Sequence, residues 1–171
     1  MSDVSDVSDV SDVSVRRAKE GDLAVAAALA GELARMHHET DPGRFFLPEN
    51  VVEGYAWWFA RVLKDQTAVL LVAEVSGRVA GYAYGALAER DWNLLLDEHG
   101  AIHDVFVAPA ERRHGVGQAL VGAIVRELEG LGAERVLLST MPSNLAAQAL
   151  FARFGFRPTF LEMTRNRPPS G

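Results

Sequence analysis

Two arginines and two glycines near the middle of the chain are the residues best suited to bind an anion. Arg112 and Arg113 precede Gly115 and Gly117, and this basic loop lies between an apolar run ending at Val107 and an amphipathic segment. The first turn of a helix has free backbone N–H groups and a partial positive charge. Glycines let that backbone approach a diphosphate closely. The pattern predicts an anion-binding turn, with a purely structural strand-to-helix turn as the alternative.

The spacing of these glycines does not match two common nucleotide motifs. A dinucleotide site needs a third glycine, but Leu120 occupies that position and no early β-α-β unit surrounds it. A nucleotide phosphate loop continues with Lys and then Ser or Thr, and neither follows Gly117. A different phosphate ligand is therefore expected.

Apolar periodicity predicts the elements that position this turn. Strands are expected at 13–17, 68–75, 78–87, 101–107, 135–139 and 157–164, and helices after Asp22, after Pro48, over 114–131 and after Asn144. Asp22 is expected to cap the first helix, and Ser76-Gly77 to join two strands as a hairpin. Antiparallel pairing in the hairpin and parallel pairing in the later β-α-β unit predict an α+β fold of order β-α-α-β-β-β-α-β-α-β.

The strand before the glycine turn has an irregular apolar spacing. Ile102 and Val105 are three residues apart, whereas Val105 and Val107 keep the two-residue period. If all three face one core, an extra residue lies near His103 and Asp104 as a β-bulge, which would splay the strand from the next and open a slot. A strand buried on both faces would also break the alternation, and the phenylalanine between the two valines fits that alternative.

Several segments together resemble the GNAT superfamily of acyltransferases. Arg112-x-x-Gly115-x-Gly117 follows a strand ending Val-x-Pro and looks like the Q/R-x-x-G-x-G/A signature that holds the acetyl-CoA diphosphate. The turn at 77–81 resembles the one into the family's third strand, and 144–156 resembles its N-x-x-A-x-x-L-Y-x-x-x-G-F segment. The resemblance covers about residues 13–165. It implies a three-layer α/β/α fold with four helices and a mixed, mostly antiparallel sheet of about six or seven strands.

This resemblance also implies where acetyl-CoA binds as the co-substrate. Backbone groups of Val105 and Val107 are expected to pair with the pantetheine arm as another strand would. Asn144 is expected to bond the pantetheine, to cap a helix, or both. The cofactor-binding residues expected on this basis are Val105, Phe106, Val107, Arg112, Arg113, His114, Gly115, Val116, Gly117, Gln118, Asn144 and Phe151.

Acetyl transfer to an amine requires a base that accepts the proton of the nucleophile. Phe151 stands where many GNAT proteins have a tyrosine acid, and Ser139 where ribosomal-protein alanine acetyltransferases have a glutamate base. A CoA thiolate can leave without an acid, since its thiol pKa is about 8.5 by analogy with cysteine. The candidate bases are Asp104, His103 and Glu74, and the candidate proton donors are Tyr82 and Tyr84, each with a structural role as the alternative.

The acceptor side is expected at 37–46 and in the second helix. Glu39 can attract an amine cation, Phe45 lies in the same segment, and Trp57 can offer a ring face. Trp58 lies on the apolar stripe of that helix and is expected in the core. Adjacent histidines at 37–38 face different ways on a helix, so no metal site is predicted.

The composition bounds the remaining possibilities. With 171 residues and no cysteine, one domain without disulfides or a thiolate zinc site is expected. The net charge of -6 includes four aspartates of a Ser-Asp-Val repeat, and setting these aside from the 23 acidic residues leaves 19 against 17 basic ones. That near balance argues against nucleic-acid binding. No apolar run reaches the ~20 residues of a membrane helix, so neither membrane nor nucleic acid is an expected partner and a cytoplasmic location is expected.

The sequence thus predicts an acetyl-CoA-dependent N-acetyltransferase in which a primary amine attacks the thioester within a ternary complex. The domain is expected over 13–165, with a low-complexity tail at 1–12 and a second tail at 166–171. A homodimer is expected from the family alone. The alternatives are a non-catalytic acyl-CoA sensor on the same fold and a nucleotide-binding or scaffolding domain. The acyl group and the amine, whether a polyamine, an antibiotic, an amino acid or a protein terminus, stay open.

Overall fold

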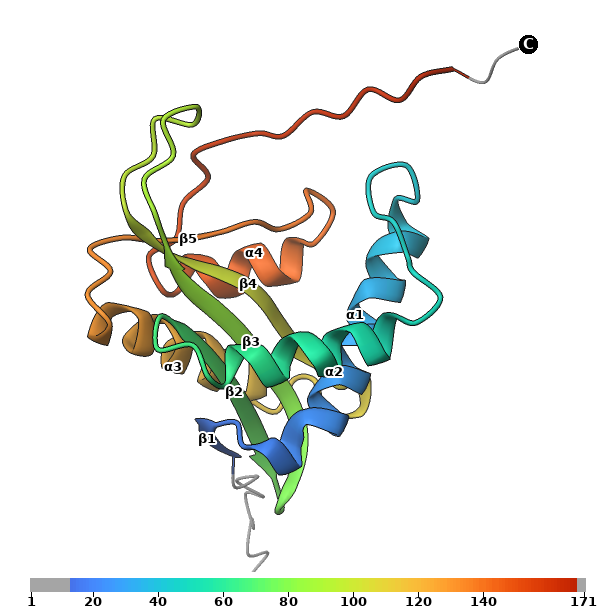
Figure 1. The fold of residues 1–171 in the computed structure, drawn as a ribbon, viewed down its shortest axis with the longest axis vertical. Helices are drawn as coiled ribbons and strands as arrows, with labels where there is room; N and C mark the ends of the chain where they lie inside the picture. Colours follow the sequence, from blue (N-terminus) through green and yellow to red (C-terminus); the bar gives the residue numbers. More distant parts are fainter. Residues whose placement is uncertain (1–12, 169–171) are drawn as a thin grey trace, which may run out of the picture.

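A five-stranded sheet lies between two layers of helices (Figure 1). The computed structural model describes residues 13–168, so the predicted tail at 1–12 and the end of the second tail lie outside the described residues. The strands are β1 (Val13–Arg17), β2 (Ala68–Val75), β3 (Arg78–Ala88), β4 (His99–Val107) and β5 (Val136–Leu138). They lie in chain order, antiparallel from β1 to β4, with β5 parallel to β4. The predicted mixed α+β sheet is confirmed.

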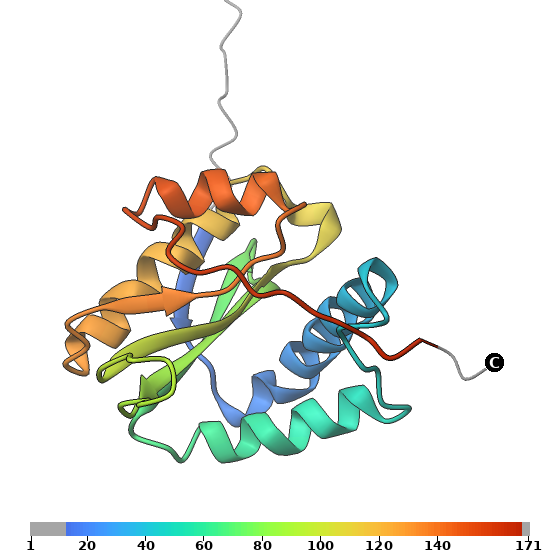
Figure 2. The ribbon, with the colours of Figure 1, turned by 90° about the horizontal axis from the view of Figure 1, so that it is seen from above.

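Four helices cover the two faces of this sheet, as Figure 2 shows from above. The helices α1 (Leu23–Thr40) and α2 (Val51–Val62) cover one face, and α3 (Val116–Gly130) and α4 (Leu145–Ala152) lie on the other side. The element order confirms the prediction as far as α4. None of these helices combines the length and the apolar character that crossing a membrane requires.

Both faces of the sheet are buried, which explains the continuous apolar run of β2. Leu70 and Val72 pack with Phe59 in the core under α1 and α2. Leu71 packs with Ile124 in the core under α3. The strand β2 is therefore packed against helices on both faces, and the sheet is a rigid support for the residues of β4.

The tight hairpin and the β-bulge are both present as predicted. Ser76 and Gly77 have φ angles of 51° and 76°, the left-handed pair that a two-residue hairpin turn requires. In the pairing of β3 with β4, Tyr84 faces Asp104 and the next residue, Gly85, faces Ile102. His103 is thus the extra residue of a bulge. Because of it, the apolar residues at 102, 105 and 107 all pack in the core under α3.

Three expectations about the elements were wrong. The segment 157–164 forms no strand in the described structure, so the sheet has five strands rather than six or seven. Pro158 lacks a ladder donor, and β5 offers only three paired residues to extend. Asp22 does not cap α1 with its side chain. Its carboxylate instead accepts the Lys19 N–H at 2.8 Å and pairs with Arg16, so a 3-10 turn precedes the helix.

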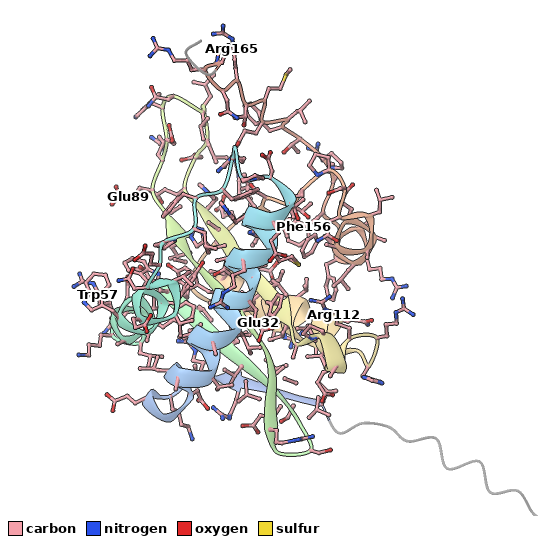
Figure 3. The ribbon with its side chains drawn as sticks, turned by 90° about the vertical axis from the view of Figure 1, so that its right-hand side faces the viewer. Glu32, Trp57, Glu89, Arg112, Phe156 and Arg165 are labelled. Carbon is pink, nitrogen blue, oxygen red and sulfur yellow. The ribbon has the colours of Figure 1, made fainter. Side chains whose placement is uncertain are left out.

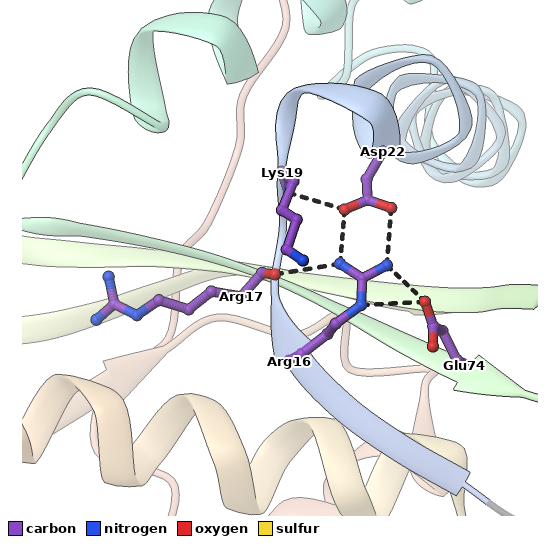
Figure 4. Close-up of polar contacts among 5 residues, drawn as sticks. All are labelled: Arg16, Arg17, Lys19, Asp22 and Glu74. Atoms are coloured by element: carbon purple, nitrogen blue, oxygen red, sulfur yellow. Dashed lines mark hydrogen bonds and ion pairs between the residues drawn. The ribbon is translucent and has the colours of Figure 1, made fainter. Parts of the chain in front are cut away.

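A network centred on Arg16 ties β1 to the adjacent elements (Figure 4). The Arg16 guanidinium donates to both oxygens of Asp22, at 2.7 and 3.0 Å, and to Glu74 of β2, at 3.0 Å from Nε. On the other side of the strand, Arg17 donates from Nε to Glu127 of α3 at 2.9 Å. Adjacent arginines on one strand thus hold both helical layers to the sheet.

Candidate active site

The outer edge of β4 is the first component of the site. Of its residues, only those at 100–102 pair with β5, so within the described chain no strand pairs with the edge at 103–107. The Ala108 N–H donates to the carbonyl of Ala80 on β3 at 2.8 Å, so Ala80 and Ala108 form a hydrogen-bonded pair of the antiparallel ladder. Since such pairs alternate along an antiparallel ladder, the peptide groups of Val105 and Val107 point to the outer edge. Two residues are thus ready to pair with an extended ligand.

The N-terminus of α3 is the second component. Gly115 caps the helix at φ 80°, and the first intrahelical bond runs from the Ala119 N–H to the Gly115 carbonyl at 3.0 Å. The N–H groups of Val116, Gly117 and Gln118 therefore have no partner inside the helix. No side chain caps this end and its first turn carries no acidic residue. These features suit an anion such as a diphosphate.

The basic loop connects this helix end to the edge of β4. Arg112 donates from Nε to the Val107 carbonyl at 3.1 Å, and its guanidinium lies 5.5 Å from the Phe106 ring centroid. Arg113 has a left-handed φ of 68°, a strained conformation for a residue with a side chain. Both arginines and His114 are exposed. The positive charge predicted from the sequence lies beside the helix end, and Arg112 itself occupies one of the carbonyl groups expected to meet pantetheine.

The helix α4 closes this side of the site. The Asn144 side chain accepts the Ala147 N–H at 3.1 Å, which confirms its role as a helix cap. Phe151 packs edge-on against Phe156, with ring centroids 6.0 Å apart, and is half-buried. A Cβ on Gly117 would lie 3.4 Å from Leu150 of α4. The glycine therefore lets α3 and α4 approach, and a larger side chain there would fill the space between them.

Asp104, next to the bulge, lies on the opposite face of the sheet. The Tyr82 hydroxyl donates to Oδ2 of Asp104 at 3.1 Å. Burial raises the pKa of this carboxyl to about 6, although the Tyr82 hydrogen bond acts in the other direction. Burial also raises the pKa of Tyr82 well above its ordinary value, so this hydroxyl keeps its proton. At neutral pH Asp104 is mostly ionised yet basic enough to accept a proton, as a general base must be.

Aromatic residues surround Asp104. The His103 ring stacks on Tyr84 at 5.0 Å, and Trp58 of α2 meets Tyr84 edge-on at 6.5 Å. Loss of solvent, with a smaller effect of His99, lowers the pKa of His103, although part of its ring stays exposed. Burial likewise raises the pKa of Tyr84. The three predicted catalytic residues, at 84, 103 and 104, are thus brought together by the bulge.

Two residues of α2, the helix expected to form part of the acceptor side, join this cluster. Burial raises the pKa of Tyr55 to about 12, and the nearby Asp104 carboxylate adds to that shift. Trp58, expected in the core, is 42% exposed and lies beside Tyr84. Both lie on the apolar stripe of the helix, where spacing alone does not distinguish a core position from one over a site.

The residues predicted for the acceptor are dispersed. Glu39 is exposed on the last turn of α1, and Phe45 stacks on His37 at 4.9 Å. Trp57 is 63% exposed, and the guanidinium of Arg61 covers its ring at 5.0 Å. Figure 3 shows Trp57 on the α2 side of the molecule, opposite Arg112. The structure does not bring these side chains to the Asp104 cluster.

The third candidate base, Glu74, lies apart from this cluster. Glu74 is held by Arg16, and the strand register places Leu70 rather than Glu74 opposite Tyr84. Among residues 13–168 there is no group of three His, Cys, Asp or Glu side chains able to hold a metal. The titratable side chains around the bulge are one carboxylate, one histidine and three tyrosines.

Comparisons with known proteins agree with this architecture. The family model of the acetyltransferase (GNAT) family matches residues 32–156. An N-alpha-acetyltransferase from Sulfurisphaera tokodaii is 34% identical over 119 residues, which cover 67% of this chain and 70% of the relative. A mycothiol acetyltransferase from Pseudarthrobacter chlorophenolicus is 30% identical over 136 residues, 76% of this chain but only 38% of the relative. The aminoglycoside N-acetyltransferase AAC(6')-Iy, solved with CoA, superposes with a TM-score of 0.69 at 19% identity over 92% of this chain and 96% of its own.

Proposed function

This chain belongs to the acetyltransferase (GNAT) family, and we propose that it transfers an acetyl group from acetyl-CoA to a small primary amine at the β4 bulge. The bulge is the observation that carries the proposal. It separates β4 from β5 beyond residue 102, and it turns Asp104 toward the face under α1 and α2. Acyl donor and amine can therefore approach the same point from opposite sides of the sheet.

The residues on the α3 side fit acetyl-CoA. The outward peptide groups of Val105 and Val107 pair with the amides of the pantetheine arm, and Arg112 swings away from the Val107 carbonyl when this happens. The free N–H groups at 116–118 bind the diphosphate, and the arginines at 112 and 113 add positive charge. The Phe106 ring lies 5.5 Å from the Arg112 guanidinium, and Phe151 packs beside the arm without donating a proton.

The reaction needs one proton acceptor. The neutral amine nitrogen attacks the thioester carbonyl carbon, Asp104 takes the one proton released from that nitrogen, and the bond to sulfur breaks to give the amide and the CoA thiolate. A thiolate leaves without protonation by the protein because a thiol pKa of about 8.5 makes it a good leaving group. His103 and Tyr84 line the approach of the amine. Holding both substrates at the bulge supplies the effective concentration that direct attack requires.

A non-catalytic acyl-CoA sensor is the second candidate. The observation in its favour is Phe151, because this position offers no proton to the leaving group. An enzyme releases CoA from acetyl-CoA in the presence of some amine, whereas a sensor binds acetyl-CoA and releases none. A panel of amino acids, polyamines, aminoglycosides and peptides with free N-termini separates the two.

Acetyl-CoA binding by calorimetry is the first test. Gly117→Trp fills the space between α3 and α4 and is expected to weaken binding at least about 100-fold, whereas Gly117→Ala, its matched control, changes it little. Arg112→Ala/Arg113→Ala is expected to weaken binding about tenfold or more through lost charge. If wild type binds ATP or NAD but no acetyl-CoA, the glycine turn serves another ligand and the proposal fails.

A further inference from the structure

The two oxygens of the Asp104 carboxylate are held differently. Oδ2 accepts the hydroxyl of Tyr82, a side chain with no exposed surface. Oδ1 receives no hydrogen bond from the part of the chain that is described here. Yet no buried, unpartnered side-chain oxygen or nitrogen occurs among these residues, so Oδ1 keeps some contact with solvent. One oxygen is thus bonded to a core side chain, and the other has no hydrogen-bond partner in the described structure.

We propose that Tyr82 is a positioning residue that holds Oδ2 of Asp104, so that Oδ1 takes the proton from the acceptor amine. This inference rests on the proposed function, since it assigns an orienting partner to the base of that reaction. Tyr82 is suited to the role because Phe59 packs on its ring, at 5.6 Å between centroids, and its strand lies in the middle of the sheet. A carboxylate fixed through one oxygen keeps the other within reach of the bulge and loses little entropy on binding an amine.

In the described structure, the other groups that face Asp104 make no hydrogen bond to its carboxylate, whereas Tyr82 does. Tyr55 approaches from α2 and Tyr84 from β3, and each experiences the charge of the carboxylate, but no hydrogen bond from either reaches it among the described residues. His103 is the neighbour on β4 and stacks on Tyr84 instead. No cation of the described chain is among the causes that shift the pKa of Asp104, so none counteracts the effect of burial. The Tyr82 hydroxyl is thus the one identified contact that favours the ionised carboxylate.

The direct test is a carboxyl-carbon NMR titration of Asp104 in protein labelled at aspartate, with Asp104→Asn used for assignment. Tyr82→Phe removes a hydrogen bond to the ionised form and is expected to raise the Asp104 pKa by about one unit. Tyr55→Phe, the matched control, removes a hydroxyl that experiences the Asp104 charge but makes no hydrogen bond to it in the described structure, and is expected to shift the Asp104 pKa by less than a third as much. An unchanged pKa in Tyr82→Phe overturns the inference. This measurement needs no acceptor.

A double-mutant cycle separates positioning from a structural role. With the amine that releases CoA fastest, Tyr82→Phe is expected to lower kcat about tenfold, leave the KM for the amine nearly unchanged and move the acid limb of the pH profile upward. In an Asp104→Asn background the same change is expected to have no further effect on kcat. Equal losses in both backgrounds would show that Tyr82 acts through folding alone.

The role of Asp104 as base and the role of Tyr82 as its positioning residue can be refuted separately. If Asp104→Asn keeps the wild-type pH profile, Asp104 is not the base and the proposed mechanism is wrong, whatever Tyr82 does. If Asp104→Asn loses activity but the Tyr82→Phe titration and cycle show no coupling, the base stands and its positioning by Tyr82 does not. Thermal unfolding of each variant shows whether it is folded at the temperature of the assay.

Discussion

The Arg16 network and the Asp104 cluster lie in the same sheet but treat carboxylates in opposite ways. Asp22 and Glu74 share one guanidinium, as Figure 4 shows, and the Arg16 hydrogen bond lowers the pKa of Asp22 below its usual value. Asp104 has one neutral hydroxyl as partner, and burial raises its pKa to about 6. Folding therefore favours the ionised form of Asp22 and disfavours the ionised form of Asp104.

This difference distinguishes a structural charge from a reactive one. A carboxylate matched by a cation holds elements together and has little tendency to take a proton. A carboxylate that is mostly buried beside aromatic side chains and has no cation as partner destabilises the fold when ionised, and the fold tolerates it where proton transfer is useful. Neutralising Asp104 should therefore lower activity and raise stability, whereas neutralising Asp22 should lower stability and leave activity nearly unchanged.

The largest expected effect is on catalysis. Asp104→Asn keeps an oxygen for the Tyr82 hydroxyl but removes the proton acceptor, so kcat should fall about 10²- to 10⁴-fold. Asp22→Asn, the matched change in the Arg16 network, should leave kcat and KM within about twofold. CoA release measures both. Comparable losses in the two variants would mean that the activity reports overall folding and that Asp104 has no special role.

The next effect is on stability, with opposite signs. Above pH 7, Asp104→Asn should raise the free energy of unfolding by at most about 3 kcal/mol, because the folded-state pKa of about 6 lies about two units above the unfolded value. Asp22→Asn should lower it by about 1–2 kcal/mol, because the Arg16 guanidinium loses its charged partner while remaining partly solvated.

The pH dependence of the two changes in the free energy of unfolding tests whether they come from the shifted pKa values. The pKa of Asp104 is raised on folding, so its contribution to stability is present below pH 3.8 and is lost as the pH rises through about 6. The pKa of Asp22 is lowered, so its contribution is present above pH 3.8 and is lost as the pH falls through the lower folded value. Urea unfolding at pH 4.5 and 8 should therefore show the Asp104→Asn gain mainly at pH 8. A gain of equal size at both values contradicts the raised pKa.

Local patterns were enough to predict the elements around the site. The Ser76-Gly77 turn, the bulge at His103 and the glycine-capped start of α3 each follow from backbone preferences and apolar spacing within a few residues. The segment 157–164 was wrongly predicted as a strand. Its residues suit a strand, but a strand also needs a partner edge, and whether β5 provides one is a tertiary property that no local pattern contains.

The contacts inside the site were harder to predict. Asp104 and His103 were predicted as candidate bases because the family resemblance places the thioester beside them, and Tyr84 was predicted as a possible proton donor. The hydrogen bond from Tyr82 to Asp104 joins positions 22 residues apart and depends on the exact register of β3 against β4. Alternation places Tyr82 in the core, which it is, but does not indicate that its hydroxyl reaches a carboxylate.

The smallest expected effect concerns the two adjacent tryptophans of α2. Trp58 contacts Tyr84 beside Asp104, whereas Trp57 points to solvent under Arg61. Trp58→Ala should raise the KM for the amine about three- to tenfold, because an aromatic contact contributes about 0.5–1.5 kcal/mol, and Trp57→Ala should change it less than twofold. Steady-state assays at varied amine concentration measure both. The opposite order would place the acceptor on the outer side of α2 and separate it from the carboxylate, so that the raised pKa of Asp104 would no longer have a role in acetyl transfer.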